Sequence, residues 1–360
     1  MMKKYLLVLT FLSVIGNAQI VRKYSNEFLN IGAGARGLAM GGAVISNQND
    51  VYAPMWNPAG LTEVESDWQG AAMHAEYFES IAKYDYISFA KALDSKDGVL
   101  GISIVRLGVD NILNTTQMID SEGNIDYDKI SKFSTSDYAG IISYAFRPGG
   151  NQKLSVGINA KIVYRNIGKF ANGFGFGFDV GTIYRADSGY QFGAMLRDAT
   201  TTVNFWSINQ KELSAVVNGE EFNPAPKDKM EITMPKLNLG VSKNFEINRD
   251  LELLPEAGLN VDFAKTASVI STDFASISPY LGAELSFQKM IFVRAGLNRF
   301  QTVTDIEDLK RKVSMQPSAG IGIKYKGLTL DYAITNTGIG GSNYFSNFFS
   351  LKLDMRDFRY

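Results

Sequence analysis

The chain has 360 residues, with 36 Lys and Arg against 37 Asp and Glu, and it contains no Cys. Balanced charge without a basic block excludes the electrostatic pattern of a nucleic-acid-binding protein, and the absence of Cys excludes disulfides, thiolate chemistry and a lipid-anchoring Cys. Aromatic residues make up 12 % of the chain, and 34 Gly against only 9 Pro favour a β-rich protein with many tight turns.

The N-terminus has the pattern of a secretory signal peptide. Lys3 and Lys4 precede an apolar run at residues 5–15, and small or polar residues follow up to Ala18. The run is too short for a membrane-spanning helix, which needs about 20 apolar residues, and no other stretch approaches that length. We therefore expect residues 1–18 to be a cleaved signal peptide and the mature protein to be exported.

Residues 19–66 do not alternate in polarity. The stretch 31–44 is rich in Gly and Ala with Arg36 as its only charge, and an Asn-Pro turn follows. Small residues suit a segment that is threaded through a crowded interior, so we predict that this region is a hatch inside a larger structure. The candidate hatch residues are Arg36, Asn57, Pro58, Ala59 and Gly60.

From residue 67 onward, about 14 segments alternate apolar and polar residues with period two. Most are about 9–11 residues long, which is enough for a tilted strand to cross a bilayer. The last one places Phe349, Leu351 and Leu353 on one face and ends near the aromatic Tyr360, as a closing barrel strand does. The predicted strands are 67–77, 84–92, 98–108, 135–147, 153–166, 172–185, 189–199, 235–246, 251–264, 277–288, 290–299, 314–326, 328–336 and 345–357.

The connections between these strands alternate in length. Those after even-numbered strands are tight, whereas those after odd-numbered strands include the long segments 108–134 and 200–234. Outer-membrane barrels have short periplasmic turns and longer extracellular loops. We therefore predict an all-β, 14-stranded antiparallel transmembrane β-barrel at residues 67–360, surrounded by outer-membrane lipid, with both termini periplasmic and the hatch in its lumen.

Glycines within the predicted strands lie mostly on the polar, lumen-facing side, with Gly140 as an exception. Because glycine weakens a strand, this bias indicates either barrel bending or a segment pressed against the inner wall. The charges on the same faces form either a paired network that holds the hatch, which we favour, or a polar permeation path. They are Lys161, Arg165, Asp179, Arg197, Asp262, Glu284, Arg294, Lys324 and Asp331.

The two long loops carry apolar side chains that water-facing loops do not need. These side chains either fold the loops over the barrel mouth or form a docking patch for a protein partner. The candidate partner-binding residues are Ile112, Leu113, Met118, Trp206 and Phe222.

At the hatch, the sequence resembles FadL-type outer-membrane barrels, and more closely their PorV/PorQ branch. The resemblance rests on residues 28–31, on Ala35 to Gly42, on the run from Trp56 to Leu61, and more loosely on residues 319–331. It covers the whole mature chain only in architecture. The PorV/PorQ branch occurs in Bacteroidota with the type IX secretion system.

This resemblance implies a protein-interaction component of type IX secretion. A PorV-like protein would carry cargo with a C-terminal signal domain from the translocon, and a PorQ-like protein would be part of the surface attachment complex; a paralogue with another role is a third possibility. The alternative is a FadL-like transporter of small hydrophobic molecules, which would need an apolar pocket beneath the loops.

No motif predicts an enzyme. His74 is the single His of a chain without Cys, so neither an ordinary zinc site nor a Cys–His pair can be built. The glycines of residues 32–37 match a dinucleotide-binding pattern by letter, but no βαβ unit surrounds them. We expect no catalytic residue, no metal and no cofactor.

Overall fold

The computed structural model describes residues 26–93, 98–120, 122–217, 220–222, 226, 229–304, 310–337 and 344–355, with the backbone alone at 215–217, 220–222 and 304. The predicted signal peptide and the terminal Tyr360 lie outside this part. One large antiparallel sheet closes on itself, because β1 (Trp68–Tyr77) pairs with both β2 (Ala82–Ala92) and β20 (Phe345–Asp354).

The barrel has the 14 strands that the alternation predicts, two of which are interrupted. One interrupted strand consists of β7 and β8, which both pair with β6. The other consists of β11, which pairs with β8, of β12, which pairs with β7, and of β13, which pairs with β14. The remaining barrel strands and the parts of these two are β3 (Val99–Asn114), β4 (Ser131–Phe146), β5 (Leu154–Ile167), β6 (Ala171–Arg185), β7 (Tyr190–Arg197), β8 (Thr202–Ile208), β11 (Met230–Thr233), β12 (Lys236–Lys243), β13 (Phe245–Glu246), β14 (Leu251–Asp262), β16 (Ser276–Phe287), β17 (Ile291–Thr304), β18 (Arg311–Tyr325) and β19 (Leu328–Asn336).

Short elements complete the fold. The N-terminal region contains η2 (Glu27–Asn30), α2 (Ala35–Ala39), α3 (Ala53–Trp56) and η3 (Pro58–Glu63). The connections contain η4 (Tyr127–Lys129), η5 (Pro148–Gly150), α4 (Gln210–Leu213), β9 (Ala215–Val217), β10 (Glu220–Phe222) and β15 (Ile270–Ser271). No helix in the described ranges is long and apolar enough to span a membrane.

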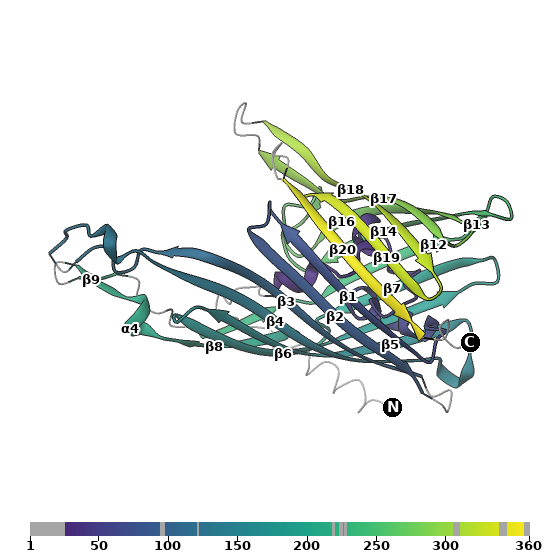
Figure 1. The fold of residues 1–360 in the computed structure, drawn as a ribbon, viewed down its shortest axis with the longest axis horizontal. Helices are drawn as coiled ribbons and strands as arrows, with labels where there is room; N and C mark the ends of the chain where they lie inside the picture. Colours follow the sequence, from purple (N-terminus) through teal and green to yellow (C-terminus); the bar gives the residue numbers. More distant parts are fainter. Residues whose placement is uncertain are drawn as a thin grey trace, which may run out of the picture.

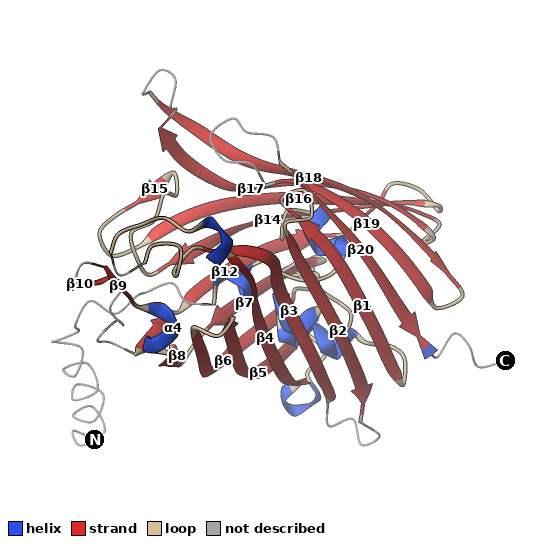
Figure 2. Ribbon diagram, turned by 60° about the vertical axis from the view of Figure 1, so that its left-hand side comes forward, coloured by secondary structure: helices blue, strands red, loops and turns tan. Residues whose placement is uncertain are grey.

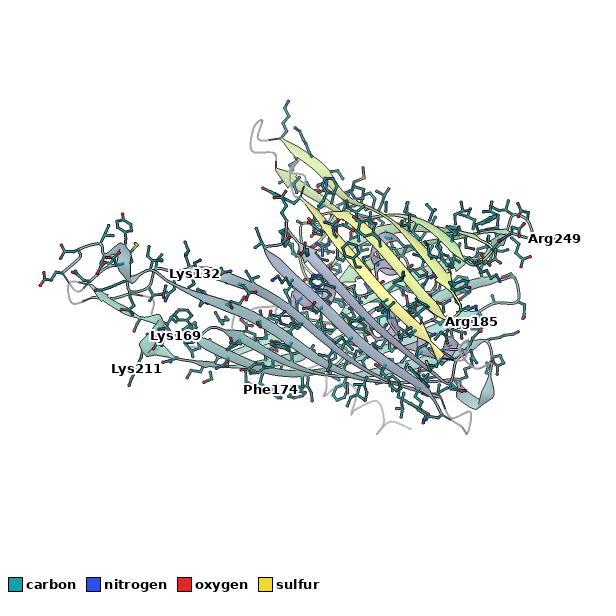
Figure 3. The ribbon with its side chains drawn as sticks, in the orientation of Figure 1. Lys132, Lys169, Phe174, Arg185, Lys211 and Arg249 are labelled. Carbon is teal, nitrogen blue, oxygen red and sulfur yellow. The ribbon has the colours of Figure 1, made fainter. Side chains whose placement is uncertain are left out.

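The side chains of the strands point in the directions that the alternation predicts. Phe174, Phe176 and Phe178 on β6 are 42–53 % exposed on the outside, and Phe174 is labelled on the wall in Figure 3. On β5, Asn159 and Lys161 point inward and are buried. An apolar outer surface with polar groups inside is the pattern of a transmembrane barrel.

The two rims of the barrel differ. One rim carries the short turns and the end of β20; at the other, β3, β4, β6 and β8 extend beyond the neighbouring strands (Figure 1). The connection predicted at 108–134 is shorter than expected, because β3 runs to Asn114 and β4 begins at Ser131. After a register shift between Val109 and Ile112, pairing of β3 with β4 resumes, so Ile112 and Leu113 lie on a strand. Trp206, also assigned to a loop, lies on β8.

Residues 26–66, here called the N-terminal segment, contact strands all around the barrel. Helix α2 lies against β17, β18, β19 and β20, whereas η3 lies against β3, β4, β5 and β6. In Figure 2 the short helices of this segment, in blue, lie among the strands of the barrel. Their backbone and most of their side chains are buried.

Glycines on the inner wall make this contact possible. A Cβ at Gly157 would overlap the backbone of Pro58 and Ala59, and one at Gly193 would overlap the carbonyl of Ile45. Gly282, Gly296 and Gly320 face Met40 or Ala39 in the same way. At Gly175 and Gly177 the close neighbour is β8 itself, so close approach of the segment and bending of the wall both contribute to the glycine bias.

We expect Gly157→Ala to destabilise the protein, because the added methyl group has no space beside the backbone of η3. Overpacking of this kind costs about 1–3 kcal/mol. Gly140→Ala is the matched control, because a Cβ at Gly140 meets nothing within 4 Å. The measurement is the temperature at which the purified barrel loses its folded mobility on gels; equal temperatures for both variants would contradict the expectation.

Candidate functional site

Glu256 of β14 fixes one turn of the N-terminal segment. Its carboxylate accepts hydrogen bonds from Ile45 N at 2.7 Å, Ser46 N at 3.0 Å, Ser46 Oγ at 2.5 Å and Asn47 Nδ2 at 2.8 Å. The sequence analysis missed this residue. Glu256 lies on the same face of its strand as Asp262, six residues further along, and this spacing could have placed it among the lumen charges.

A chain of alternating charges anchors α2. Arg36 Nε lies 2.9 Å from Glu284, which also accepts from Arg294 Nε at 2.6 Å, and Arg294 reaches Asp331 at 2.6 Å. Glu284, Arg294 and Asp331 are among the predicted lumen charges. Two cations and two anions balance formally, as buried charges require.

A second cluster lies where strand β7 is interrupted. Lys161 Nζ is 2.6 Å from both Asp179 and Asp198, and all three residues are more than nine-tenths buried. Asp198 has a φ of 50°, and its carboxylate also accepts a hydrogen bond from Thr202 Oγ1. The ion cluster thus forms at the irregular backbone between β7 and β8.

The other predicted lumen charges fall into separate small groups. Arg165 pairs with Asp137 at 2.9 Å, and Asp262 lies 3.5 Å from Lys236. Arg197 donates to the carbonyl oxygens of Leu29 and Met55 and therefore binds the N-terminal segment directly. Lys324 lines the cavity at the short-turn rim.

Asp50 of the N-terminal segment pairs with Lys352 of the closing strand at 3.0 Å. Burial acts to raise the pKa of Asp50, but Lys352, Arg36 and the N–H of Tyr52 outweigh it, so the pKa lies below its ordinary value of 3.8. Asp50 is therefore ionised at neutral pH and attracts Lys352 as a full charge.

Two polar cavities lie on either side of the N-terminal segment. The outer vestibule, toward the rim with the long strands, has a volume of about 530 Å³. The inner vestibule, toward the short-turn rim, has a volume of about 560 Å³ and is lined by Arg36, Lys324 and Lys352 among others. Because the segment contributes residues to both linings, it lies between them.

The outer vestibule combines an apolar base with polar walls. Leu38, Ile45 and Trp56 of the N-terminal segment contribute to its base, and the aromatic rings of Tyr77 and Phe348 adjoin them. The polar lining comes from a run of neighbouring strands, β7, β12, β14, β16, β17, β18 and β19. Its members include Arg197, Lys236, Asn260, Asp262, Ser278, Asn298, Gln316 and Thr335.

The predicted docking residues do not form one patch. Leu113 is 61 % exposed, whereas Ile112 and Met118 are half-buried. Trp206 was wrongly placed in a water-facing loop: its ring packs over Gly173 and lies 5.2 Å from the guanidinium of Arg165. The side chain of Phe222 lies outside the described part.

His74 belongs to a small charged cluster. Its Nδ1 lies 2.7 Å from Asp85, which also pairs with Arg106 at 3.1 Å on the outer face of the wall. Within the described ranges, no three His, Cys, Asp or Glu residues lie where they could hold a metal ion.

The comparisons with known proteins give the fold. No family model and no curated protein sequence matches the chain. The Ralstonia pickettii toluene transporter TbuX is similar, with a TM-score of 0.56 at 14% identity over 90% of this chain and 98% of that chain. The Pseudomonas putida toluene transporter TodX has a TM-score of 0.55 at 14% identity over 93% and 98% of the two chains.

A Pseudomonas aeruginosa FadL homologue is also similar, with a TM-score of 0.51 at 10% identity over 89% of this chain and 98% of that chain. The protein therefore has the fold of FadL-type transmembrane barrels. At these sequence identities, a shared fold does not show that two barrels bind the same ligand. The chemistry of the site therefore has to be argued from its own residues.

We expect Glu284→Gln to lower the free energy of unfolding by about 3–5 kcal/mol, because it leaves two buried guanidinium groups with one carboxylate between them. Glu252→Gln is the control, since Glu252 pairs with the exposed Lys289 and such pairs are worth about 0–1 kcal/mol. Denaturant unfolding in detergent micelles measures both. Equal destabilisation by the two variants would show that the buried Arg36 cluster contributes no more to stability than an exposed ion pair does.

Proposed function

We propose that this protein is an exported outer-membrane barrel that binds small amphipathic molecules in its outer vestibule and passes them inward, without catalysing a reaction. The observation that carries the proposal is the lining of that cavity. Polar residues such as Arg197, Asn260 and Gln316 line the same cavity as the apolar base. A ligand with one polar group and a small apolar body would match such a lining.

The apolar base gives the rest of such a ligand its contact surface. Leu38, Trp56 and the neighbouring aromatic rings would bury a small hydrocarbon body, while the polar wall residues would hold its polar group. Similarity of fold to two toluene transporters supports a small ligand. The polar walls favour an amphipathic molecule over a pure hydrocarbon.

In this proposal the N-terminal segment acts as a plug. It lies between the two vestibules, and its buried ion pairs hold it to β16 and β20. Passage would then require a local rearrangement of the segment. We accordingly expect no large stable conductance from the intact protein in planar bilayers.

A matched pair of ligands tests the chemistry. We expect p-cresol to bind about fivefold more tightly than toluene, because its hydroxyl adds about one hydrogen bond, worth roughly 1 kcal/mol, to the same apolar ring. Calorimetric titration of the barrel in detergent measures both affinities. Equal or weaker binding of p-cresol would contradict a role for the polar walls.

A matched pair of variants tests whether the ligand binds in the outer vestibule. Gln316→Trp should weaken binding, because Gln316 lines the vestibule and an indole there would take up space that the ligand needs. Met315→Trp is the control, because the neighbouring side chain is 53 % exposed on the outer face. Unchanged binding to Gln316→Trp in a folded barrel would place the ligand elsewhere.

A second function, as a partner-binding component of type IX secretion, rests on the sequence resemblance and on one feature of the structure. The projecting hairpin of β3 and β4 exposes apolar side chains near its tip, including Ile119, Ile125 and Tyr127 at 40–70 % exposure. Secretion-system proteins or exported cargo could bind there. Exposed apolar groups on a projecting element are typical of protein-binding sites.

Tyr127→Ala combined with Ile125→Ala should then reduce co-purification of secretion-system proteins from native membranes at least thirtyfold, as expected for loss of about 2 kcal/mol from interface anchors. Phe78→Ala is the control, since Phe78 is 44 % exposed on the short hairpin between β1 and β2. Unchanged recovery per folded barrel would remove the structural support for this function.

A further inference from the structure

The outer face of the barrel carries an apolar groove of about 640 Å³. It crosses β12, β14, β16, β17 and β18, where small outward side chains replace the large ones found elsewhere on the wall. Ala283 pairs with Ala295, and Ala257 lies on the adjoining strand β14. Leu281 and Leu297 border these alanines.

The wall is thin at this groove. Behind it, Gly282 and Gly296 face the backbone of Met40, so neither face of the sheet carries a bulky side chain. Pro255 adds to the irregularity, since it lies opposite the interruption between β12 and β13. Proline has no N–H for the ladder and is confined to such bulges and edges.

One end of the groove carries a cation at the level expected for lipid headgroups. Lys243 Nζ lies 4.7 Å from the ring centroid of Tyr190 and 5.6 Å from that of Phe245, and all three residues line the groove. Lys243 ends β12 at the short-turn rim. Aromatic residues with a neighbouring Lys mark the membrane interface, where the ammonium group can reach lipid phosphates.

From this combination we infer that the groove binds one phospholipid of the leaflet at the short-turn rim, with an acyl chain over Ala283 and Ala295 and the phosphate beside Lys243. Charge complementarity selects this occupant: an apolar channel with a single cation at its interfacial end matches a lipid with an anionic head.

Native mass spectrometry of the full barrel with dioleoyl phosphatidylglycerol tests the inference. The wild-type protein should retain one lipid through detergent exchange, and Ala295→Trp, which fills the groove, should reduce its occupancy at least tenfold. Ala160→Trp is the matched control, because it changes an outward alanine of β5 on another part of the wall and should leave occupancy unchanged.

The headgroup contact has its own pair of variants. Lys243→Gln should weaken retention about fivefold, as expected for one Lys near a lipid surface, whereas Lys289→Gln at the same rim, outside the groove, should not. Equal retention by the wild type and Ala295→Trp, or equal loss in Ala160→Trp, would overturn the inference. A wild-type dimer that Ala295→Trp converts to a monomer would also overturn it, because a second copy would then occupy the groove.

Discussion

The structure depends on one requirement: a chain segment inside a membrane barrel must have its backbone N–H and C=O groups paired, since each buried unpaired group costs free energy. The N-terminal segment is too irregular to pair all of them internally. The wall supplies the missing partners from strands far apart in the sequence. Glu256 accepts from Ile45 and Ser46, Ser350 from Ala35, and Gln69 from Val51, while Arg197 and Asn159 donate to carbonyl oxygens of the segment.

A similar requirement explains why the buried charges of the lumen are paired. Lys161, Arg294 and Glu284 are more than nine-tenths buried and already pair with opposite charges. Removing them from water is costly, and only partners at short distance recover that cost. Glycines on the inner wall are part of this arrangement, because they let the segment come close enough for the wall's short side chains to reach its backbone.

Much of this could be predicted from alternation alone. The number of strands, the direction in which Phe174 and Lys161 point, and the difference between the two rims all follow from period-two patterns and loop lengths. The interruption at residues 198–201 could not be predicted from the sequence. A bulge made of polar residues leaves no distinct mark in the pattern of alternating polarity. For the same reason Trp206 was assigned to a loop, although it continues an interrupted strand, and Glu256 was overlooked although its face was correctly assigned.

If the outer vestibule binds a ligand as proposed, its specificity would depend on which residues meet at the base. The strands contribute polar groups to the lining, whereas the apolar contacts come largely from the N-terminal segment, through Leu38, Ile45 and Trp56. Trp56 is itself held by a hydrogen bond from its Nε1 to the carbonyl of Ala33, and a Cβ at Gly37 would overlap its ring. Any ligand that enters the vestibule therefore touches the element that separates it from the inner one. A barrel with the same strands and a different N-terminal segment would present another base. Similarity of fold to toluene transporters therefore does not identify the ligand, which in this proposal depends on residues 31–56.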